Sequence, residues 1–379
     1  MPLGSPKRTI QSFVQNSNIR LILICLCVTV YGCLLVYSAS HGYGYGFGGA
    51  STHIIASCIG FVAALFISQA DYDDICALWP IWAGISLILM ILTFTPLGLN
   101  ATGTDDTAWL GIGSLTFQPS ELMKIAFIIT FAVHLTRVQK NIRSLKTVLL
   151  LGLHALIPTM LVFLQGDDGT AIVFIMIFLS MLFVSGINAL YYIVGLTGIC
   201  AAIPILWSVM SEDKKARILC ILPTYIEEHL QGAGWQQYEA LKAIGSGQLV
   251  GTGYLNTTNG SLFARNNDLI FTVAGEEFGF IGTILLLLLI VLLLLELFRC
   301  AQQARDPLGT YLCVGMLALI GFQSIINLGM NLRLLPVIGI TLPFFSAGGS
   351  SVATLYLGIG LVLSVSFSQS SRKKKSLLS

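Results

Sequence analysis

Long apolar runs separated by short polar links extend through most of the sequence. A helix needs about 20 apolar residues to cross a bilayer. By this length the sequence predicts membrane-spanning helices at residues 19–38, 52–70, 75–96, 119–137, 147–164, 168–186, 188–210, 268–298, 308–330 and 345–368. We therefore expect an all-α polytopic membrane protein with about ten transmembrane helices.

Interruptions of this pattern predict three further features. The only long polar stretch, 211–267, has glycines that favour tight turns, so we expect a long extracytoplasmic loop containing short surface helices. The eighth span is unusually long, which predicts a tilt or break near Gly279 and Gly282. Two prolines and a glycine pair between Leu335 and Ser351 predict irregular backbone before the last helix. Such backbone must be buried in protein or line a cavity, which indicates a re-entrant segment.

The distribution of Lys and Arg predicts the orientation of the chain. Cytoplasmic links carry an excess of these residues. Here they gather before the first span, after the fourth and eighth, and at the C-terminus. We therefore expect both termini in the cytoplasm. The predicted organisation is a cytoplasmic tail (1–18), transmembrane helices 1–7 (19–210), an extracytoplasmic loop (211–267), transmembrane helices 8–10 (268–368) and a basic cytoplasmic tail (369–379).

Composition supports lipid as the solvent of most of the chain. Hydrophobic residues make up 55% of it and charged residues 10%, whereas soluble domains carry about 25% charged residues. The formal net charge is only +2, so we expect no nucleic-acid partner. Function must be sought in individual charges close to the membrane.

The most informative single residue is Asp268, which lies where the long loop enters an apolar helix. An ionisable group at membrane depth is costly and by default indicates a functional site. Alternatively, Asp268 is only the N-cap of its helix, a position that favours Asp. Glu276 and Glu277 follow in the same span and must face protein or a water-filled cavity.

Other charges lie near the same predicted boundary. Glu121 falls in the first turn of a span, where the helix dipole favours an anion, and Lys124 follows on the same face. The two form either a local ion pair or a site for an anionic headgroup. Asp167 either caps the next helix or holds a cation or basic residue of the site. The long loop adds three basic residues whose interest comes from adjoining Asp268: Arg217, Lys242 and Arg265.

Together these segments resemble the SEDS family, the polytopic cell-wall polymerases that include RodA and FtsW. The resemblance covers nearly the whole sequence, and the short tails favour the RodA type. One departure is the stretch before Asp268, which lacks the Pro-Glu usual in the family. The matching segments, in order, are Phe117–Lys124, Gln165-x-Asp167-x-Gly169-Thr170, Gly232-x-Gly234, Ala243–Gly247, Asp268 with Ile270-Phe271, Glu276-Glu277-x-Gly279, and Leu335-Pro336 through Gly348-Gly349-Ser350.

The resemblance implies a peptidoglycan glycosyltransferase of the bacterial cytoplasmic membrane. Such an enzyme polymerises lipid II outside the membrane, beside a class B penicillin-binding protein. Asp268 would be the base for the acceptor hydroxyl or would hold a divalent cation, Mg or Mn, and no organic cofactor is expected. The candidate substrate-binding residues are Lys124, Arg217, Lys242, Arg265, Trp109 and Ser350. The residues expected to organise the cavity are Glu121, Asp167, Glu276 and Glu277.

Three other functions fit parts of the pattern. A flippase for lipid II, or another transporter of lipid-linked sugars, would use the same cavity and cations but would need no base. A non-enzymatic scaffold that docks a synthase would need neither the cavity with its cations nor the base. An ordinary ion-coupled transporter fits least, because the acids gather near the exterior end rather than at the midplane.

Overall fold

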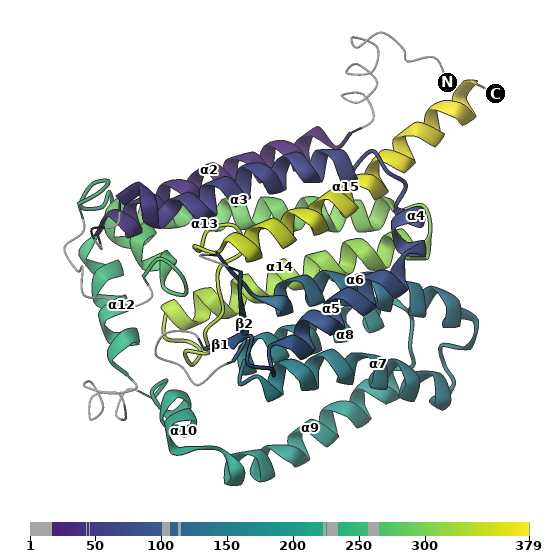
Figure 1. Ribbon diagram of the computed structural model, residues 1–379, viewed down its shortest axis with the longest axis horizontal. Coiled ribbons are helices and arrows are strands. Elements are labelled where there is room, and N and C mark those ends of the chain that lie inside the picture. Colours follow the sequence, from purple (N-terminus) through teal and green to yellow (C-terminus); the bar gives the residue numbers. More distant parts are fainter. Residues whose placement is uncertain are drawn as a thin grey trace.

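The computed structural model describes residues 17–42, 44, 46–100, 107–112, 115–222, 225, 234–256 and 265–378. Helices dominate the fold (Figure 1). They are α2 (Ile19–Gly42), α3 (Gly46–Ile67), α4 (Tyr72–Ala77), α5 (Trp79–Leu92), α6 (Pro119–Val138), the 3-10 helix η1 (Gln139–Asn141), α7 (Leu145–Leu164), α8 (Asp168–Val184), α9 (Ala189–Val209), α10 (Glu212–Leu219), α12 (Trp235–Ser246), α13 (Ile270–Gln303), α14 (Pro307–Asn331) and α15 (Gly349–Leu378).

Helices occupy all ten predicted spans, and the third is divided between α4 and α5. Asp71 caps α4 by accepting a hydrogen bond from the Asp73 amide, and a proline lies in the first turn of α5. Within the described residues, seven helices are long and apolar enough to cross a membrane: α2, α3, α7, α9, α13, α14 and α15. Two further apolar helices, α5 and α8, are shorter, with 14 and 17 residues. The chain is thus a multi-pass membrane protein.

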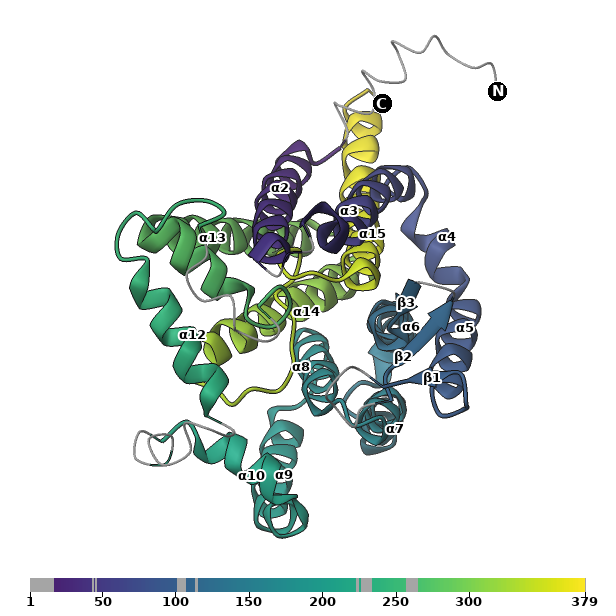
Figure 2. The same ribbon diagram turned by 60° about the vertical axis from the view of Figure 1, so that its left-hand side comes forward.

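The bundle is organised around α14, which packs against α6, α8, α13 and α15. Outside this centre, α2 packs on α13, α3 on α15 and α5 on α6. Two views place α9 at the edge of the bundle (Figures 1 and 2). Its first turn is anchored by Tyr191, whose hydroxyl donates to the Arg143 carbonyl, and by Tyr192, whose hydroxyl donates to the Leu179 carbonyl. The rest of α9 is largely exposed, as expected for a helix surrounded by lipid.

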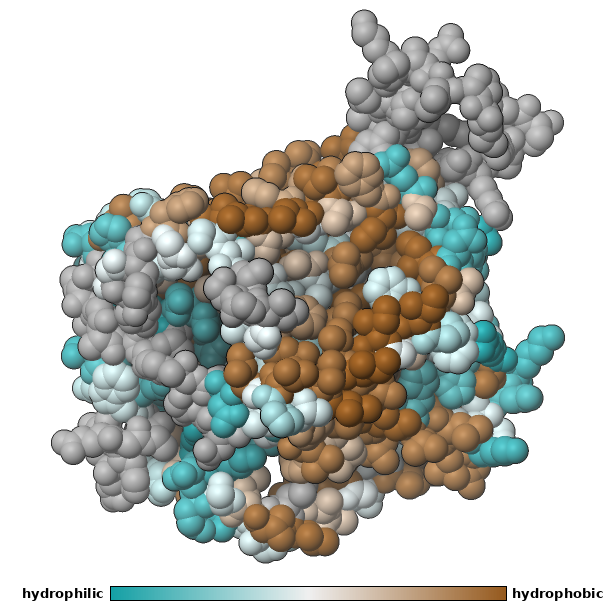
Figure 3. All heavy atoms as spheres, viewed as in Figure 1, coloured by the Kyte–Doolittle hydropathy of each residue, from teal (hydrophilic) through white to brown (hydrophobic). Residues whose placement is uncertain are grey.

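The surface has the polarity of a membrane protein. Hydrophobic side chains cover the middle of the molecule in Figure 3, and hydrophilic side chains gather at its two ends. Exposed Leu, Ile, Val and Phe residues on the spanning helices form this apolar surface. Among the described helices, the first, α2, begins and the last, α15, ends at the same end of the bundle (Figure 1), as an even number of crossings requires.

A small antiparallel sheet departs from the all-helical prediction. It contains β1 (Gly98–Leu99), β2 (Trp109–Ile112) and β3 (Leu115–Phe117) in that order. Leu99 pairs with Trp109, and Leu110 pairs with Phe117. The sheet leads directly into α6, so it helps to fix the start of that helix.

The predicted break in the eighth span is confirmed at Gly279. Its φ of 63° and ψ of −156° are not helical, and this backbone conformation is essentially restricted to glycine. Beyond the break, the Phe280 and Ile281 amides donate to the carbonyls of Gln248 and Leu249. The segment after α12 therefore supplies acceptors that the interrupted helix lacks.

We predict that Gly279→Ala lowers the melting temperature of the purified protein. An added Cβ would lie 2.4 Å from the Gly251 nitrogen, and the positive φ adds strain of about 1–3 kcal/mol. Gly152→Ala is the matched control, because nothing lies within 4 Å of its Cβ and α7 is helical there. Equal thermal stability of the two variants in one detergent would contradict the prediction.

Candidate functional site

Asp268 lies in a turn at residues 265–269, before α13 begins. The N-cap of α13 is Leu269, and no side chain caps the helix. The interpretation of Asp268 as a simple N-cap is therefore wrong. Asp268 itself is half-buried.

Two buried asparagines of α14 hold the Asp268 main chain. The side-chain amides of Asn327 and Asn331 donate to the Asp268 carbonyl over 2.8 and 2.9 Å. Neither asparagine was predicted as part of the site. Their spacing of four residues places them on one helix face, and polar residues within an apolar span face protein. That signal was available in the sequence.

The non-helical segment between α14 and α15 lies against the same turn, as expected for the predicted re-entrant segment. Asn327 also donates to the Ile340 carbonyl over 2.7 Å. Ser346 donates to the Asn267 carbonyl over 2.6 Å, and the Ala347 amide donates to the Asn266 carbonyl over 2.8 Å. These bonds satisfy irregular backbone that has no helical partners.

Two glycines allow this segment to approach the site closely. Gly339 has a φ of 72°, and a Cβ there would lie 3.9 Å from Asp268 Oδ2. A Cβ on Gly169, in the first turn of α8, would lie 2.5 Å from the Ile338 carbonyl oxygen. The segment is therefore packed between the start of α8 and Asp268.

Electrostatics distinguish Asp268 from an ordinary surface acid. Burial, followed by the negative charge of Asp167, raises the pKa of the Asp268 carboxyl from its ordinary value of 3.8 to about 6. Both effects disfavour the ionised form. A carboxyl with such a pKa can exchange a proton near neutral pH, which is the property required of a general base.

Asp167 connects Asp268 to the start of α6. It caps α8, because its side chain accepts a hydrogen bond from the main-chain amide of Thr170 over 2.8 Å. The side-chain amide of Gln118 donates to its other carboxylate oxygen over 3.2 Å. Gln118 is the N-cap residue of α6. The predicted capping role is confirmed, and Asp167 also acts on the Asp268 charge.

The predicted ion pair between Glu121 and Lys124 is confirmed in the first turns of α6. The Lys124 ammonium lies 2.9 Å from Glu121 Oε1, and both side chains are buried. An ammonium has three N–H donors, so one bond to Glu121 does not exhaust its capacity. The starts of α6 and α8 thus place a buried cation in the same part of the protein as Asp167.

Arg265 has a different setting from the one predicted. Its guanidinium is 2% exposed and lies 2.7 Å from Glu276 Oε2 and 3.6 Å from Glu277 Oε1. Glu277 also accepts hydrogen bonds from Ser38 and from the Leu255 amide. The Arg265 charge therefore compensates two buried acids, and these acids face protein as expected. A contact between Arg265 and substrate stays a prediction.

The remaining candidate residues are less closely connected to Asp268. Lys242 on α12 is 60% exposed and lies 3.6 Å from Glu239 Oε1. Arg217 is exposed on α10. Trp109 in β2 and Ser350 in the first turn of α15 are both half-buried. Their roles in substrate binding stay predictions.

The metal prediction can be narrowed by the available ligands. Among the described residues, no group of three or more His, Cys, Asp and Glu side chains could hold a metal ion. Mg²⁺ commonly uses one or two carboxylates and takes its other ligands from substrate phosphates and water. Asp268 and the neighbouring Asp167 could therefore hold a metal ion only together with substrate phosphates and water.

Comparison with known proteins adds independent information. The family model described as "Cell cycle protein", for FtsW, RodA and SpoVE, matches residues 19–371. The chain is 33% identical over 365 residues to stage V sporulation protein E of Bacillus subtilis, covering 93% of this chain and 97% of that protein. It is 32% identical over 349 residues to the peptidoglycan glycosyltransferase MrdB of Escherichia coli, covering 91% of this chain and 92% of that protein.

A solved structure shares the fold over nearly the whole chain. That structure is described as "Structural coordination of polymerization and crosslinking by a peptidoglycan synthase complex". The TM-score is 0.80 at 26% sequence identity, with 93% of this chain and 98% of that chain covered.

We predict that Arg265→Gln strongly destabilises the protein. Removing one partner of a buried ion pair leaves uncompensated charge and typically costs about 3–5 kcal/mol. Arg217→Gln is the matched control, since Arg217 is exposed and its loss should change stability by less than about 0.5 kcal/mol. Thermal unfolding of both variants in one detergent measures the difference. An Arg265→Gln protein as stable as the control would contradict the proposed role of this ion pair in stability.

Proposed function

The chain belongs to the FtsW, RodA and SpoVE family of cell cycle proteins, and on that premise we propose that it is a peptidoglycan glycosyltransferase. It would polymerise lipid II into glycan strands at the outer face of the bacterial cytoplasmic membrane, with both termini in the cytoplasm. The observation that carries the proposal is the Asp268 carboxyl, half-buried in a firmly bonded turn with a pKa raised to about 6.

Asp268 is proposed as the general base of glycosyl transfer. It would accept the proton of the acceptor sugar hydroxyl as that oxygen bonds to the anomeric carbon of the donor. The bond from this carbon to the pyrophosphate oxygen breaks, and undecaprenyl pyrophosphate leaves as an anion. A general base works best when its pKa lies near the operating pH, which the raised pKa of Asp268 supports.

The leaving group requires positive charge rather than a general acid. Lys124 is proposed to face the pyrophosphate, because it is a buried cation with donors beyond its bond to Glu121. Arg217, Lys242, Trp109 and Ser350 would complete the substrate contacts. In the alternative to its role as the base, Asp268 would hold a divalent cation, Mg or Mn, together with Asp167, and that cation would neutralise pyrophosphate charge.

The partner is proposed to be a class B penicillin-binding protein. The support is the similarity to a chain of a peptidoglycan synthase complex that coordinates polymerization with crosslinking. In such a complex this chain would supply polymerisation and its partner the crosslinking transpeptidase.

We predict that Asp268→Asn lowers the rate of glycan polymerisation by at least about 10²-fold, because a neutral amide cannot accept the proton. The assay uses purified protein and lipid II in detergent, where flipping is irrelevant, with and without a chelator. Asp213→Asn, at an exposed acid on α10, is the control and should keep the wild-type rate. Full polymerisation by Asp268→Asn would exclude the catalytic role. No polymerisation by wild-type protein would favour a flippase or a scaffold.

We also predict that polymerisation rises with pH through about 6. Below this pH the Asp268 carboxyl is protonated and cannot act as a base, so the rate should fall about tenfold per pH unit. Asp167→Asn should move the midpoint to lower pH, because it removes the neighbouring negative charge, while Asn still serves as an N-cap. Asp168→Asn is the control for the midpoint. A midpoint that is the same in all three proteins would exclude the proposed coupling between Asp167 and Asp268.

A further inference from the structure

A polar pocket lies at the end of the bundle opposite Asp268. Its volume is about 630 Å³, and it is open on one side. The walls come from η1, the link to α7, and the end of α8: Gln139, Lys140, Asn141, Ile142, Arg143, Ser144, Ser185 and Gly186. Because α6 has 20 residues, about 30 Å separates this pocket from the start of that helix. The pocket therefore takes no part in the site around Asp268.

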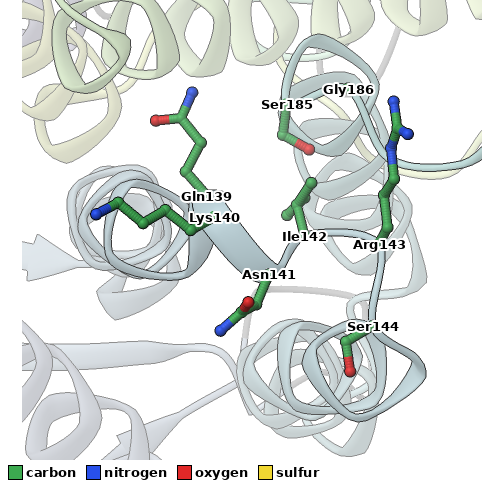
Figure 4. A pocket seen from close by; sticks show the side chains of 8 residues that line it. All are labelled: Gln139, Lys140, Asn141, Ile142, Arg143, Ser144, Ser185 and Gly186. Atoms are coloured by element: carbon green, nitrogen blue, oxygen red, sulfur yellow. The ribbon is translucent and has the colours of Figure 1, made fainter.

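The pocket is positively charged. Lys140 and Arg143 line it, and no acidic residue does. Within the described part of the chain, neither cation forms an ion pair. In Figure 4 the two side chains extend in different directions, Lys140 to the left and Arg143 upward on the right, with Gln139, Ile142 and Ser185 between them. Two uncompensated cations around one hollow favour an anionic ligand.

The donors of the pocket suit a phosphate. Arg143 offers a planar set of N–H groups, and Lys140 a compact charge. Gln139 and Asn141 add side-chain amides. Ser144 is the N-cap of α7 but makes no capping hydrogen bond, so the first amides of α7 remain available to an anion.

The loop that carries these donors is held in place from both sides. The Ser144 amide donates to the Asn141 carbonyl over 3.0 Å, and the Tyr191 hydroxyl donates to the Arg143 carbonyl over 3.0 Å. Ile142 is 8% exposed and belongs to the hydrophobic core. A ligand would therefore meet a largely preformed site and would order few groups on binding.

Exposed apolar side chains next to the pocket indicate what the anion is attached to. Leu145 and Leu149 on α7, Phe183 on α8, and Leu190 on α9 are 58–74% exposed. Lipid chains would cover these residues in a membrane. Nearby, Trp79 stacks with the Arg137 guanidinium at 5.1 Å, and such aromatic residues gather at the level of lipid headgroups. The polar pocket, whose donors suit a phosphate, thus lies next to an apolar surface that suits acyl chains.

We propose that this pocket binds the phosphate headgroup of an anionic membrane phospholipid, with Lys140 and Arg143 as its principal contacts and the exposed faces of α7, α8 and α9 receiving the acyl chains. The site is independent of the proposed glycosyltransferase activity. Under the predicted topology, the lipid comes from the cytoplasmic leaflet.

Binding is tested on the purified full-length protein by native mass spectrometry during lipid titration. The probes are dioctanoyl phosphatidylglycerol, dioctanoyl phosphatidylcholine and inorganic phosphate. Phosphatidylglycerol should bind about tenfold more tightly than phosphatidylcholine, because only the first carries net negative charge. Inorganic phosphate should neither bind comparably nor compete. Equal binding or full competition by inorganic phosphate would overturn the lipid assignment in favour of a free-anion site.

Two variants locate the binding. Lys140→Gln/Arg143→Gln should weaken phosphatidylglycerol binding by about tenfold or more, the effect of two charges at a membrane surface. Its matched control is Lys146→Gln/Arg299→Gln, which removes two exposed cations that do not line the pocket. Asn141→Trp keeps both charges but fills the pocket, and it should also weaken binding. Equal losses in the control pair, or wild-type binding by Asn141→Trp, would overturn the proposal.

Discussion

Non-helical backbone at membrane depth must have its peptide groups satisfied by protein, and the candidate site depends on how this is done. Asn327 and Asn331 donate to the Asp268 carbonyl, and Asn327 also reaches Ile340. One face of α14 therefore holds two irregular segments at once, the turn before α13 and the chain before α15. Because α14 also packs against α6, α8, α13 and α15 at the centre of the bundle, the core of the protein fixes the position of Asp268.

The acids near this turn differ in their surroundings. Glu121 lies beside Lys124, and Glu276 and Glu277 lie beside Arg265, all of them buried. Within the described residues, Asp268 forms no ion pair, and the charge that raises its pKa is that of another acid, Asp167. The charged groups around it thus organise the protein, while Asp268 keeps a carboxyl that can change its protonation state.

The sequence predicted those features that depend on neighbours along the chain. Lengths of apolar runs placed the helices, and the Glu121–Lys124 pair followed from a spacing of three residues. The ion pair between Arg265 and Glu276 was not predicted, because Glu276 lies in a different element and hydropathy carries no information on that pairing. The small sheet was missed because a window of spanning length averages over strands as short as β3. The available signal was the alternation of large apolar residues with glycine or threonine in Leu110-Gly111-Ile112 and Leu115-Thr116-Phe117.

The break at Gly279 makes α13 depend on the segment that follows α12. After the break, the amides of Phe280 and Ile281 have as acceptors the carbonyls of Gln248 and Leu249, so a helix cap is supplied by chain that lies about thirty residues earlier. An insertion or deletion in that earlier segment would leave amides of a membrane helix without acceptors. The loop after α12 therefore cannot vary in length as surface loops usually do, and it must change together with α13.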